Sequence, residues 1–220
     1  MRVLLINGSP HEKGCTYTIL AEVAGQIEAA GIGTEFFHIG DGPIRGCTGC
    51  GGCAETARCI YNDDGVNACV EKLIQADGVV IGSPVYYAGP NGALCAFLDR
   101  LFFKKSQFFA FKPGAAVVNC RRSGGTSAFD RLNKYFTLSR MPVVSSQYWN
   151  TTHGFTPEEV RQDKEGMQIM RTLGKNMAWM LKAIAKEGIT EIAAQQESVA
   201  QTNFIRGSGL IPHSSNNETD

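Results

Sequence analysis

The N-terminal stretch constrains the fold most, because it joins a strand-like run, a glycine-containing turn and a helix-like pattern. Residues 2–7 are a short apolar run, and the apolar positions over 19–27 fall on one face of a helix. In the turn between them, Ser9 and Thr16 can donate hydroxyl hydrogen bonds, and Gly14 lets backbone N–H groups approach an anion. Thr16 can also cap the helix, whose N-terminus favours a phosphate. We therefore expect a phosphate cradle here, with an ordinary strand–helix turn as the alternative.

This turn matches neither of the two common nucleotide-binding loops. The motif G-x-x-x-x-G-K-[ST] is absent, because Lys13 is followed by Gly14-Cys15, and G-x-G-x-x-G is absent as well. A cradle without a lysine clamp suits a terminal monophosphate better than a triphosphate.

Strand-like and helix-like segments alternate along the chain. The last helix is expected to open at Thr156-Pro157, where a capping residue precedes a proline of the first turn. This alternation predicts an α/β fold with a doubly wound, five-stranded parallel sheet. The expected strands are residues 2–7, 33–39, 77–82, 114–119 and 142–146.

Three of the expected strands end in glycine-rich or polar loops, at residues 8–16, 83–90 and 119–126. The carboxyl ends of parallel strands lie at one edge of the sheet, and ligands of such sheets bind there. The sequence therefore predicts a single site, in which the first loop holds a phosphate and the other two hold a flat ring.

The charge balance argues against two classes of partner. Lys and Arg together number 21 and so do Asp and Glu, so no net basic field favours nucleic acid or an anionic membrane surface.

The apolar run at the start is too short for a signal peptide, and no stretch approaches the ~20 apolar residues of a membrane span. We expect a cytoplasmic location, where the eight cysteines would be ligands, redox groups or buried fillers rather than disulfides.

A segment without periodicity, residues 40–64, holds half of the cysteines. Structureless loops beyond about 12–15 residues are usually functional or disordered. The C-x2-C-x2-C spacing resembles the run that wraps a cubane iron–sulfur cluster. Zinc, a thiol–disulfide pair, or cysteines that bind nothing are the alternatives. The four candidate ligands are Cys47, Cys50, Cys53 and Cys59.

In these residues the chain resembles the flavodoxin-like NAD(P)H-dependent FMN reductases, and within them the iron–sulfur flavoproteins. The resemblance covers about residues 1–187. It is carried by the following segments: Gly8-Ser9-Pro10 with Gly14-Cys15-Thr16, Gly82 to Tyr87 with Phe97-Leu98-Asp99-Arg100, the four cysteines followed by Asp63-Asp64, Cys120 to Thr126, and Gln147-Tyr148-Trp149-Asn150.

The resemblance implies a sheet in the flavodoxin order 2-1-3-4-5 and a bound FMN. This chain departs from the family pattern at two positions, which are His11, more often Arg in the family, and Cys15, often Asn or Ser. Both changes would weaken phosphate binding. The implied phosphate ligands are Ser9, His11, Gly14, Cys15 and Thr16. The implied ring contacts are Pro84, Val85, Tyr86, Tyr87 and Gly89, with Asn119, Cys120, Arg121, Gly124, Gly125 and Thr126 on the far side.

The predicted function is that of an FMN-dependent oxidoreductase. It would pass electrons from NAD(P)H through FMN to a flavin, a quinone or a redox protein, with a [4Fe–4S] cluster on the four cysteines as a further carrier. No side chain must act as acid or base, so no catalytic residue is named. The alternatives are a non-enzymatic electron-transfer iron–sulfur flavoprotein and a zinc-stabilised binding domain.

The domain organisation follows from composition. Residues 1–187 are expected to form the FMN-binding domain, and residues 188–220 a C-terminal arm that is partly disordered. Phe204 and Ile205 are adjacent large apolar residues in this polar arm and need a surface to cover them. We expect a homodimer or homotetramer in which the arm binds subunits together.

Overall fold

A computed structural model describes residues 1–103 and 105–188. Residues Met1–Lys186 form one compact unit. The predicted C-terminal arm, with Phe204 and Ile205, lies outside the described residues apart from Gly188.

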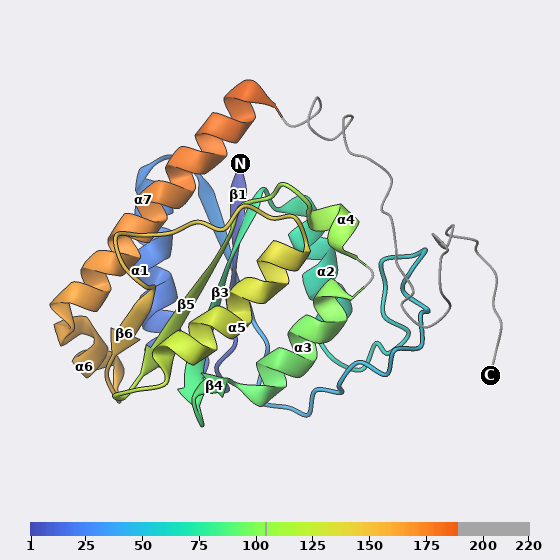
Figure 1. The fold of residues 1–220 in the computed structure, drawn as a ribbon, viewed down its shortest axis with the longest axis horizontal. Coiled ribbons are helices and arrows are strands. Elements are labelled where there is room, and N and C mark those ends of the chain that lie inside the picture. Colours follow the sequence, from blue (N-terminus) through green and yellow to red (C-terminus); the bar gives the residue numbers. More distant parts are fainter. Residues whose placement is uncertain (104, 189–220) are drawn as a thin grey trace, which may run out of the picture. The chain divides into compact units, whose positions relative to one another are not determined.

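The sheet is built mainly from parallel strands (Figure 1). In chain order the strands are β1 Arg2–Asn7, β2 Gly33–His38, β3 Gly78–Tyr86, β4 Gly89–Pro90, β5 Gly114–Cys120 and β6 Thr151–His153. The order across the sheet is β2-β1-β3-β5-β6, and β4 pairs antiparallel with the end of β3. Apart from this short hairpin, the strands follow the flavodoxin order, and the predicted doubly wound fold is confirmed.

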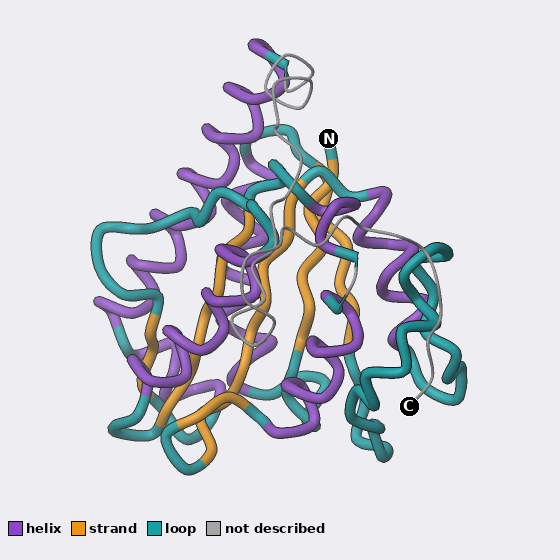
Figure 2. The backbone as a smooth tube through the Cα atoms, turned by 45° about the vertical axis from the view of Figure 1, so that its right-hand side comes forward, coloured by secondary structure: helices purple, strands orange, loops and turns teal. Residues whose placement is uncertain are grey.

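Helices cover both faces of the sheet, as Figures 1 and 2 show. One face carries α1 Cys15–Ala29 and α7 Lys164–Glu187, and the other carries α2 Val66–Gln75, α3 Gly92–Phe102, α4 Ser106–Phe109 and α5 Gly125–Leu138. In β1, Val3 and Leu5 pack toward the first set, and Leu4 and Ile6 toward the second. Because both faces of β1 are buried, its sequence is continuously apolar instead of alternating.

The predicted fifth strand, residues 142–146, is wrong. Val143 makes one isolated bridge to Gly114, and the strand that pairs with β5 is β6. The chain leaves the sheet after Val144, which donates its backbone N–H to the Gly114 carbonyl at 2.9 Å. The chain returns to the sheet at Asn150, whose side-chain amide donates to the Ala116 carbonyl at 3.0 Å. A side chain thus makes the hydrogen bond that a continuous edge strand would make with its backbone.

The predicted last helix is divided in two. Thr156 caps α6 Pro157–Gln162 as expected, accepting from the Glu159 backbone N–H at 3.3 Å. The helix then stops at Asp163, whose carboxylate accepts from the Gly166 N–H at 2.9 Å and from the His153 N–H at 2.7 Å. An aspartate that caps a new helix competes with the continuous helix, and α7 begins at the next residue.

Between β2 and α2 lies the long loop 39–65, without regular secondary structure, as predicted. In Figures 1 and 2 it runs beside α2 and α3. Within residues 1–103 and 105–188, no helix has the length and apolar character needed to cross a lipid bilayer.

Candidate functional site

The structure brings the three predicted loops together at the carboxyl edge of the sheet. The Gly8 backbone N–H donates to the Gly82 carbonyl at 2.9 Å, which joins the first loop to β3. A Cβ atom on Gly124 would lie 2.8 Å from the Ala88 Cα, so the third loop packs directly on the second. One ligand placed at this edge can therefore contact all three loops.

The first loop holds its shape through its own hydrogen bonds. The Asn7 amide accepts from the Ser9 N–H at 3.1 Å and donates to the Glu12 carbonyl at 3.0 Å. Ser9 accepts from the His11 N–H at 3.1 Å through its hydroxyl, which is therefore already engaged inside the loop. His38, to which the sequence assigned no role, places Nε2 2.8 Å from the Ser9 carbonyl. The parallel register of β1 and β2 pairs Asn7 with His38, and this pairing brings the imidazole beside the first loop.

Thr16 differs from its predicted role as a helix cap. Helix α1 begins at Cys15 with Gly14 as its N-cap and no side-chain cap. Thr16 is buried in the first turn, and its Oγ1 is one of the few buried side-chain polar atoms of the described residues without a hydrogen-bond partner. Its methyl group faces Gly82, where an added Cβ would lie 2.8 Å from Thr16 Cγ2. A buried hydroxyl without a partner beside the free N–H groups of a helix N-terminus fits a bound phosphate.

Cys15 lies next to this hydroxyl at the start of α1. Burial raises the pKa of the Cys15 thiol, a backbone hydrogen bond lowers it, and the charges of Glu159 and Glu158 raise it further. The net effect keeps the thiol neutral at physiological pH. Cys15 therefore presents no negative charge to an anion in the loop.

The second loop presents two exposed aromatic side chains. Strand β3 runs to Tyr86, and the chain turns back into β4 through Tyr87 and Ala88, whose φ angles are 48° and 60°. Positive φ at both central residues is the mark of a type I′ hairpin and is strained for residues other than Gly, Asn and Asp. Tyr86 is exposed, Tyr87 is fully so, and Pro84 and Val85 are half-buried below them. These four side chains offer an apolar surface to a ring.

The third loop is held from behind. Asn119 donates its amide to the Gly154 carbonyl at 3.0 Å and accepts from the Thr152 hydroxyl at 2.9 Å, so this side chain supports the loop. Cys120 is buried, and burial raises the pKa of its thiol. Gly124 takes the left-handed conformation, with φ at 86°, and α5 starts at the next residue. The backbone N–H groups of Gly125 and Thr126 are therefore at a helix N-terminus, while Arg121 is exposed.

Asn91, which sequence reasoning missed, links the first two loops. It is buried, and its amide donates to the Gly8 carbonyl at 2.8 Å. Its backbone N–H donates to the Ser83 hydroxyl at 3.0 Å, and its Oδ1 caps α3 at the Ala93 N–H. The available signal is an asparagine immediately before a helical apolar stripe, a typical capping position.

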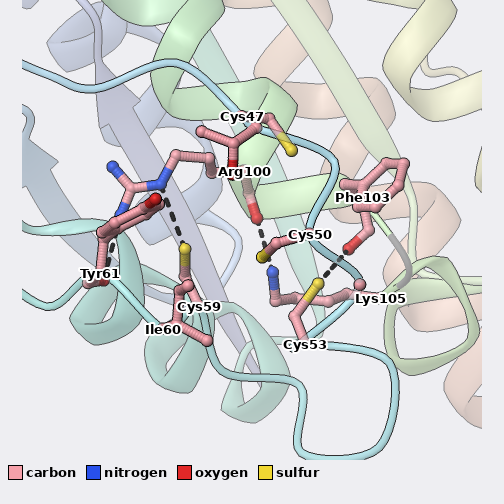
Figure 3. Close-up of a pocket in the computed structure, with 11 residues that line it drawn as sticks. Cys47, Cys50, Cys53, Cys59, Ile60, Tyr61, Arg100, Phe103 and Lys105 are labelled. Atoms are coloured by element: carbon pink, nitrogen blue, oxygen red, sulfur yellow. Dashed lines mark hydrogen bonds between the residues drawn. The ribbon is translucent and has the colours of Figure 1, made fainter. Parts of the chain in front are cut away.

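The four cysteines of the long loop line one pocket (Figure 3). Within the described residues, no three Cys, His, Asp or Glu side chains lie close enough to hold a metal ion as they stand. The donor set nevertheless fits a thiolate-bound centre, because none of the described residues lining the pocket is His, Asp or Glu. The loop has to close for the four thiols to reach one centre. Its glycines give it freedom, and Gly49 and Gly51 take positive φ angles of 69° and 76°. The lining residues include Cys47, Cys50, Cys53, Cys59, Tyr61, Arg100, Phe103 and Lys105.

Two buried cations stand beside these thiols. Arg100 is 2% exposed and Lys105 is fully buried. Burial lowers the pKa of Arg100, but hydrogen bonds to Asp64 and Cys59, with the charges of those two groups, outweigh burial and raise it. The guanidinium is thus a permanent positive charge next to Cys59.

The cysteine pocket does not lie beside the three strand-end loops, although loop 39–65 leaves the sheet at the same edge. Asn91, at the start of α3, belongs to that edge, whereas Arg100 and Phe103 lie at the other end of the helix. Arg100 comes nine positions after Asn91, which corresponds to about 14 Å along the helix axis at 1.5 Å per residue. The two sites are therefore neighbours along α3 without sharing a wall.

Known proteins match this chain over most of its length. The model of the NADPH-dependent FMN reductase family matches residues 1–156. An iron–sulfur flavoprotein of Methanocaldococcus jannaschii is 34% identical over 194 residues, which cover 84% of this chain and 100% of the relative. An iron–sulfur flavoprotein of Archaeoglobus fulgidus is 34% identical over 208 residues, covering 92% of this chain and 100% of the relative.

Solved structures agree on the fold. RosB, crystallised with a formylriboflavin phosphate intermediate, aligns with a TM-score of 0.66 at 15% identity, over 100% of this chain and 97% of its own. An NADH:FMN oxidoreductase aligns with a TM-score of 0.58 at 17% identity, over 83% of this chain and 89% of its own. At such identities these likenesses concern the fold alone, whereas the family model and the curated relatives concern the sequence. The chain therefore belongs to the family of NADPH-dependent FMN reductases and iron–sulfur flavoproteins.

Proposed function

We propose that this protein is an FMN-dependent oxidoreductase that takes electrons from NAD(P)H and passes them to a flavin, a quinone or a redox protein. The observation that carries the proposal is the buried Thr16 hydroxyl, which has no partner and stands in the first turn of α1. It lies at the edge where the strained Tyr87–Ala88 turn meets Gly124. A phosphate site and an exposed aromatic surface at one edge suit a flavin mononucleotide.

FMN, when bound, would supply the redox chemistry, which is the transfer of hydride and electrons between a nicotinamide and an acceptor. The chain binds and orients it. Thr16 and the free N–H groups of α1 would hold the phosphate, because the helix dipole favours negative charge there. Tyr86 and Tyr87 would contact the ring, and the loop at Gly124, which packs closely on Ala88, would bound its other side. Hydride transfer needs this orientation and no protein acid or base, so we assign no catalytic residue.

The test is to identify the released cofactor and its reductant. We expect about one FMN per chain on denaturation, detected by mass, and bleaching of the bound flavin when NADPH or NADH is added without oxygen. Protein that releases FAD, or that carries no flavin after incubation with FMN, contradicts the proposal. A flavin that binds but is reduced only by a protein partner favours the non-enzymatic electron carrier instead.

We also propose that Cys47, Cys50, Cys53 and Cys59 hold one [4Fe–4S] cluster, which would serve as a one-electron carrier. The support is the pocket that all four thiols line, next to two buried cations. Anaerobic protein is expected to contain about four irons and four sulfides per chain, as a cubane requires. Cys53→Ala should remove the iron and leave FMN bound. Stoichiometric zinc, or no metal after anaerobic reconstitution, would exclude the cluster and leave the FMN proposal intact.

A further inference from the structure

The guanidinium of Arg100 is buried at the back of the cysteine pocket, and all five of its N–H groups are used. Nε donates to Cys59 Sγ at 3.3 Å. One terminal nitrogen donates to the Arg45 carbonyl at 3.2 Å and to Asp64, and the other donates to the Tyr61 carbonyl at 3.1 Å and to Asp64 at 3.2 Å. Five N–H groups are the complete donor set of an arginine. Arg100 therefore has no donor left for water or for another ligand.

The partners of Arg100 lie on both sides of the four cysteines in sequence. Arg45 precedes Cys47, and Tyr61 and Asp64 follow Cys59. The Arg100 side chain, which extends from helix α3, thus hydrogen-bonds to residues on both sides of the four cysteines. In Figure 3, dashed lines join the Arg100 guanidinium to Cys59 and to Tyr61. The Arg100 and Asp64 side chains are only 1% and 8% exposed, so water screens neither charge effectively.

Arg100 also holds the second cation of the pocket. Its carbonyl oxygen accepts a hydrogen bond from Lys105 Nζ at 2.6 Å. In Figure 3 the Lys105 amine points toward the region of Cys50 and Cys53. Cys53 in turn donates to the carbonyl of Phe103, the residue that follows α3, at 3.4 Å. The end of α3 therefore supplies the charged wall of the pocket.

We propose that Arg100 is the positioning residue of the cysteine centre: it presets the loop for ligation and makes the centre easier to reduce. This inference rests on the proposed cluster. A charge-assisted hydrogen bond to a ligand sulfur, and a fixed positive charge beside it, stabilise the form that carries one more electron. Asp64 acts in the opposite sense, since its carboxylate holds the guanidinium in place but offsets part of its charge.

The decisive measurement is the midpoint potential of anaerobically reconstituted holoprotein. Arg100→Gln removes the charge and should lower the potential, and a tenfold change in the reduction equilibrium corresponds to 59 mV for one electron. Arg100→Lys keeps the charge and should stay nearer the wild type. Asp64→Asn removes the opposing charge and should raise the potential. Asp99→Asn, one residue away on α3, is the matched control: it also removes one negative charge, but Asp99 pairs with Arg131 and not with Arg100, so it should raise the potential less than Asp64→Asn does.

These signs separate an electrostatic role from a merely structural one. If Arg100 only held the loop together, the Arg100 and Asp64 variants would all move the potential in the same direction, and that result would overturn the inference. An Arg100→Gln protein with iron bound and an unchanged potential would overturn it as well. If Arg100→Gln takes up no iron, the midpoint potentials of Asp64→Asn and Asp99→Asn provide the test. The proposal requires a higher potential in Asp64→Asn than in Asp99→Asn.

A second measurement keeps this inference separate from the proposed cluster. In protein without iron, hydrogen exchange of the amides over residues 45–64 should be at least tenfold faster in Arg100→Gln than in wild type or Asp99→Asn. Wild-type protein that takes up no iron would refute the cluster, while the exchange rates would still report on the preset loop. Equal exchange rates in the three proteins would refute the loop role whether or not iron binds.

Discussion

The side-chain amide of Asn91 donates a hydrogen bond to the Gly8 carbonyl oxygen at 2.8 Å, so the start of α3 is joined to the loop 8–16. The same buried residue also caps α3, because its Oδ1 accepts from the Ala93 backbone N–H. A single side chain therefore sets the distance between the expected phosphate contacts and the start of the ring-binding loop.

Asn91→Ala should lower both stability and flavin affinity. It leaves the buried Gly8 carbonyl without a partner and α3 without a cap, and a buried unpaired polar group alone costs about 1–3 kcal/mol. Denaturant unfolding measures the first effect, and titration of the FMN-free protein with FMN measures the second. Asn176→Ala is the control, because Asn176 lies on α7 and its amide donates to the Ser145 carbonyl, outside the three loops. An Asn91→Ala protein that binds FMN as wild type does would remove Asn91 from the site.

Thr16→Val should weaken FMN binding with little loss of stability. Valine keeps the shape and the methyl packing against Gly82 but removes a hydroxyl that has no protein partner. The lost bond to a charged phosphate corresponds to about 1.5–3 kcal/mol. Thr18→Val is the matched control on the same helix, since its hydroxyl already donates to the Gly14 carbonyl at 3.2 Å. Equal dissociation constants for FMN in Thr16→Val and wild type would contradict the cradle.

Cys15→Ser should strengthen FMN binding. A serine hydroxyl is a better hydrogen-bond donor than a thiol and has nearly the same size. The raised pKa of Cys15 already keeps that position uncharged, so the substitution changes donor strength and not charge. The check is the FMN dissociation constant at neutral pH, with Cys95→Ser on α3 as the control. A weaker complex would show that Cys15 packs against the ligand instead of donating to it.

The sequence allowed most of the fold to be predicted because the strands of the sheet's centre are buried on both faces. Val3 and Leu5 serve one core and Leu4 and Ile6 the other, which leaves a continuous apolar run that few alternatives match. The edge of the sheet escaped prediction for the opposite reason. Val143 and Val144 look like a strand, but the polar side chain of Asn150 takes over the pairing farther along the chain.

The candidate site was predictable where local chemistry defines it and not where tertiary contacts do. Gly124 and the Tyr87–Ala88 turn each follow a strand of the sheet, so the topology alone places both at the carboxyl edge. Asn91 and Arg100 gain their roles from partners more than thirty residues away, at Gly8 and Asp64. No spacing rule in the sequence points from a helix residue to a carbonyl or carboxylate in an irregular loop.

Gly124→Ala should destabilise the protein and weaken FMN binding. A left-handed φ of 86° costs a residue with a Cβ about 1–2 kcal/mol, and the new Cβ would lie 2.8 Å from the Ala88 backbone. Gly25→Ala should instead raise the free energy of unfolding, because Gly25 lies inside α1 with nothing within 4 Å of an added Cβ. Alanine is better than glycine in a helix interior by about 1 kcal/mol. Unfolding curves of the two variants should therefore fall on either side of the wild type.

Tyr135 supplies a prediction for alkaline pH. Its hydroxyl donates to Asp99 at 2.5 Å and accepts from Arg131 at 2.9 Å. Burial, followed by the hydrogen bond and charge of Asp99, raises the pKa of Tyr135 above its ordinary value of about 10. Between the unfolded and folded pKa values the folded state therefore binds more protons, and the free energy of unfolding falls as the pH rises.

The stabilisation due to the Tyr135 hydroxyl is therefore fully present below pH ~10 and is lost as the pH rises above that value. Unfolding free energies of wild type and Tyr135→Phe should differ by a constant amount between pH 7 and 9 and converge at higher pH. All other titrating groups are common to the two proteins, so their contributions cancel in the difference. Asp99→Asn should shrink the effect, because it removes the negative charge that opposes ionisation of Tyr135. Parallel curves for wild type and Tyr135→Phe up to pH 11 would show that the hydroxyl ionises as easily in the folded protein as in the unfolded one.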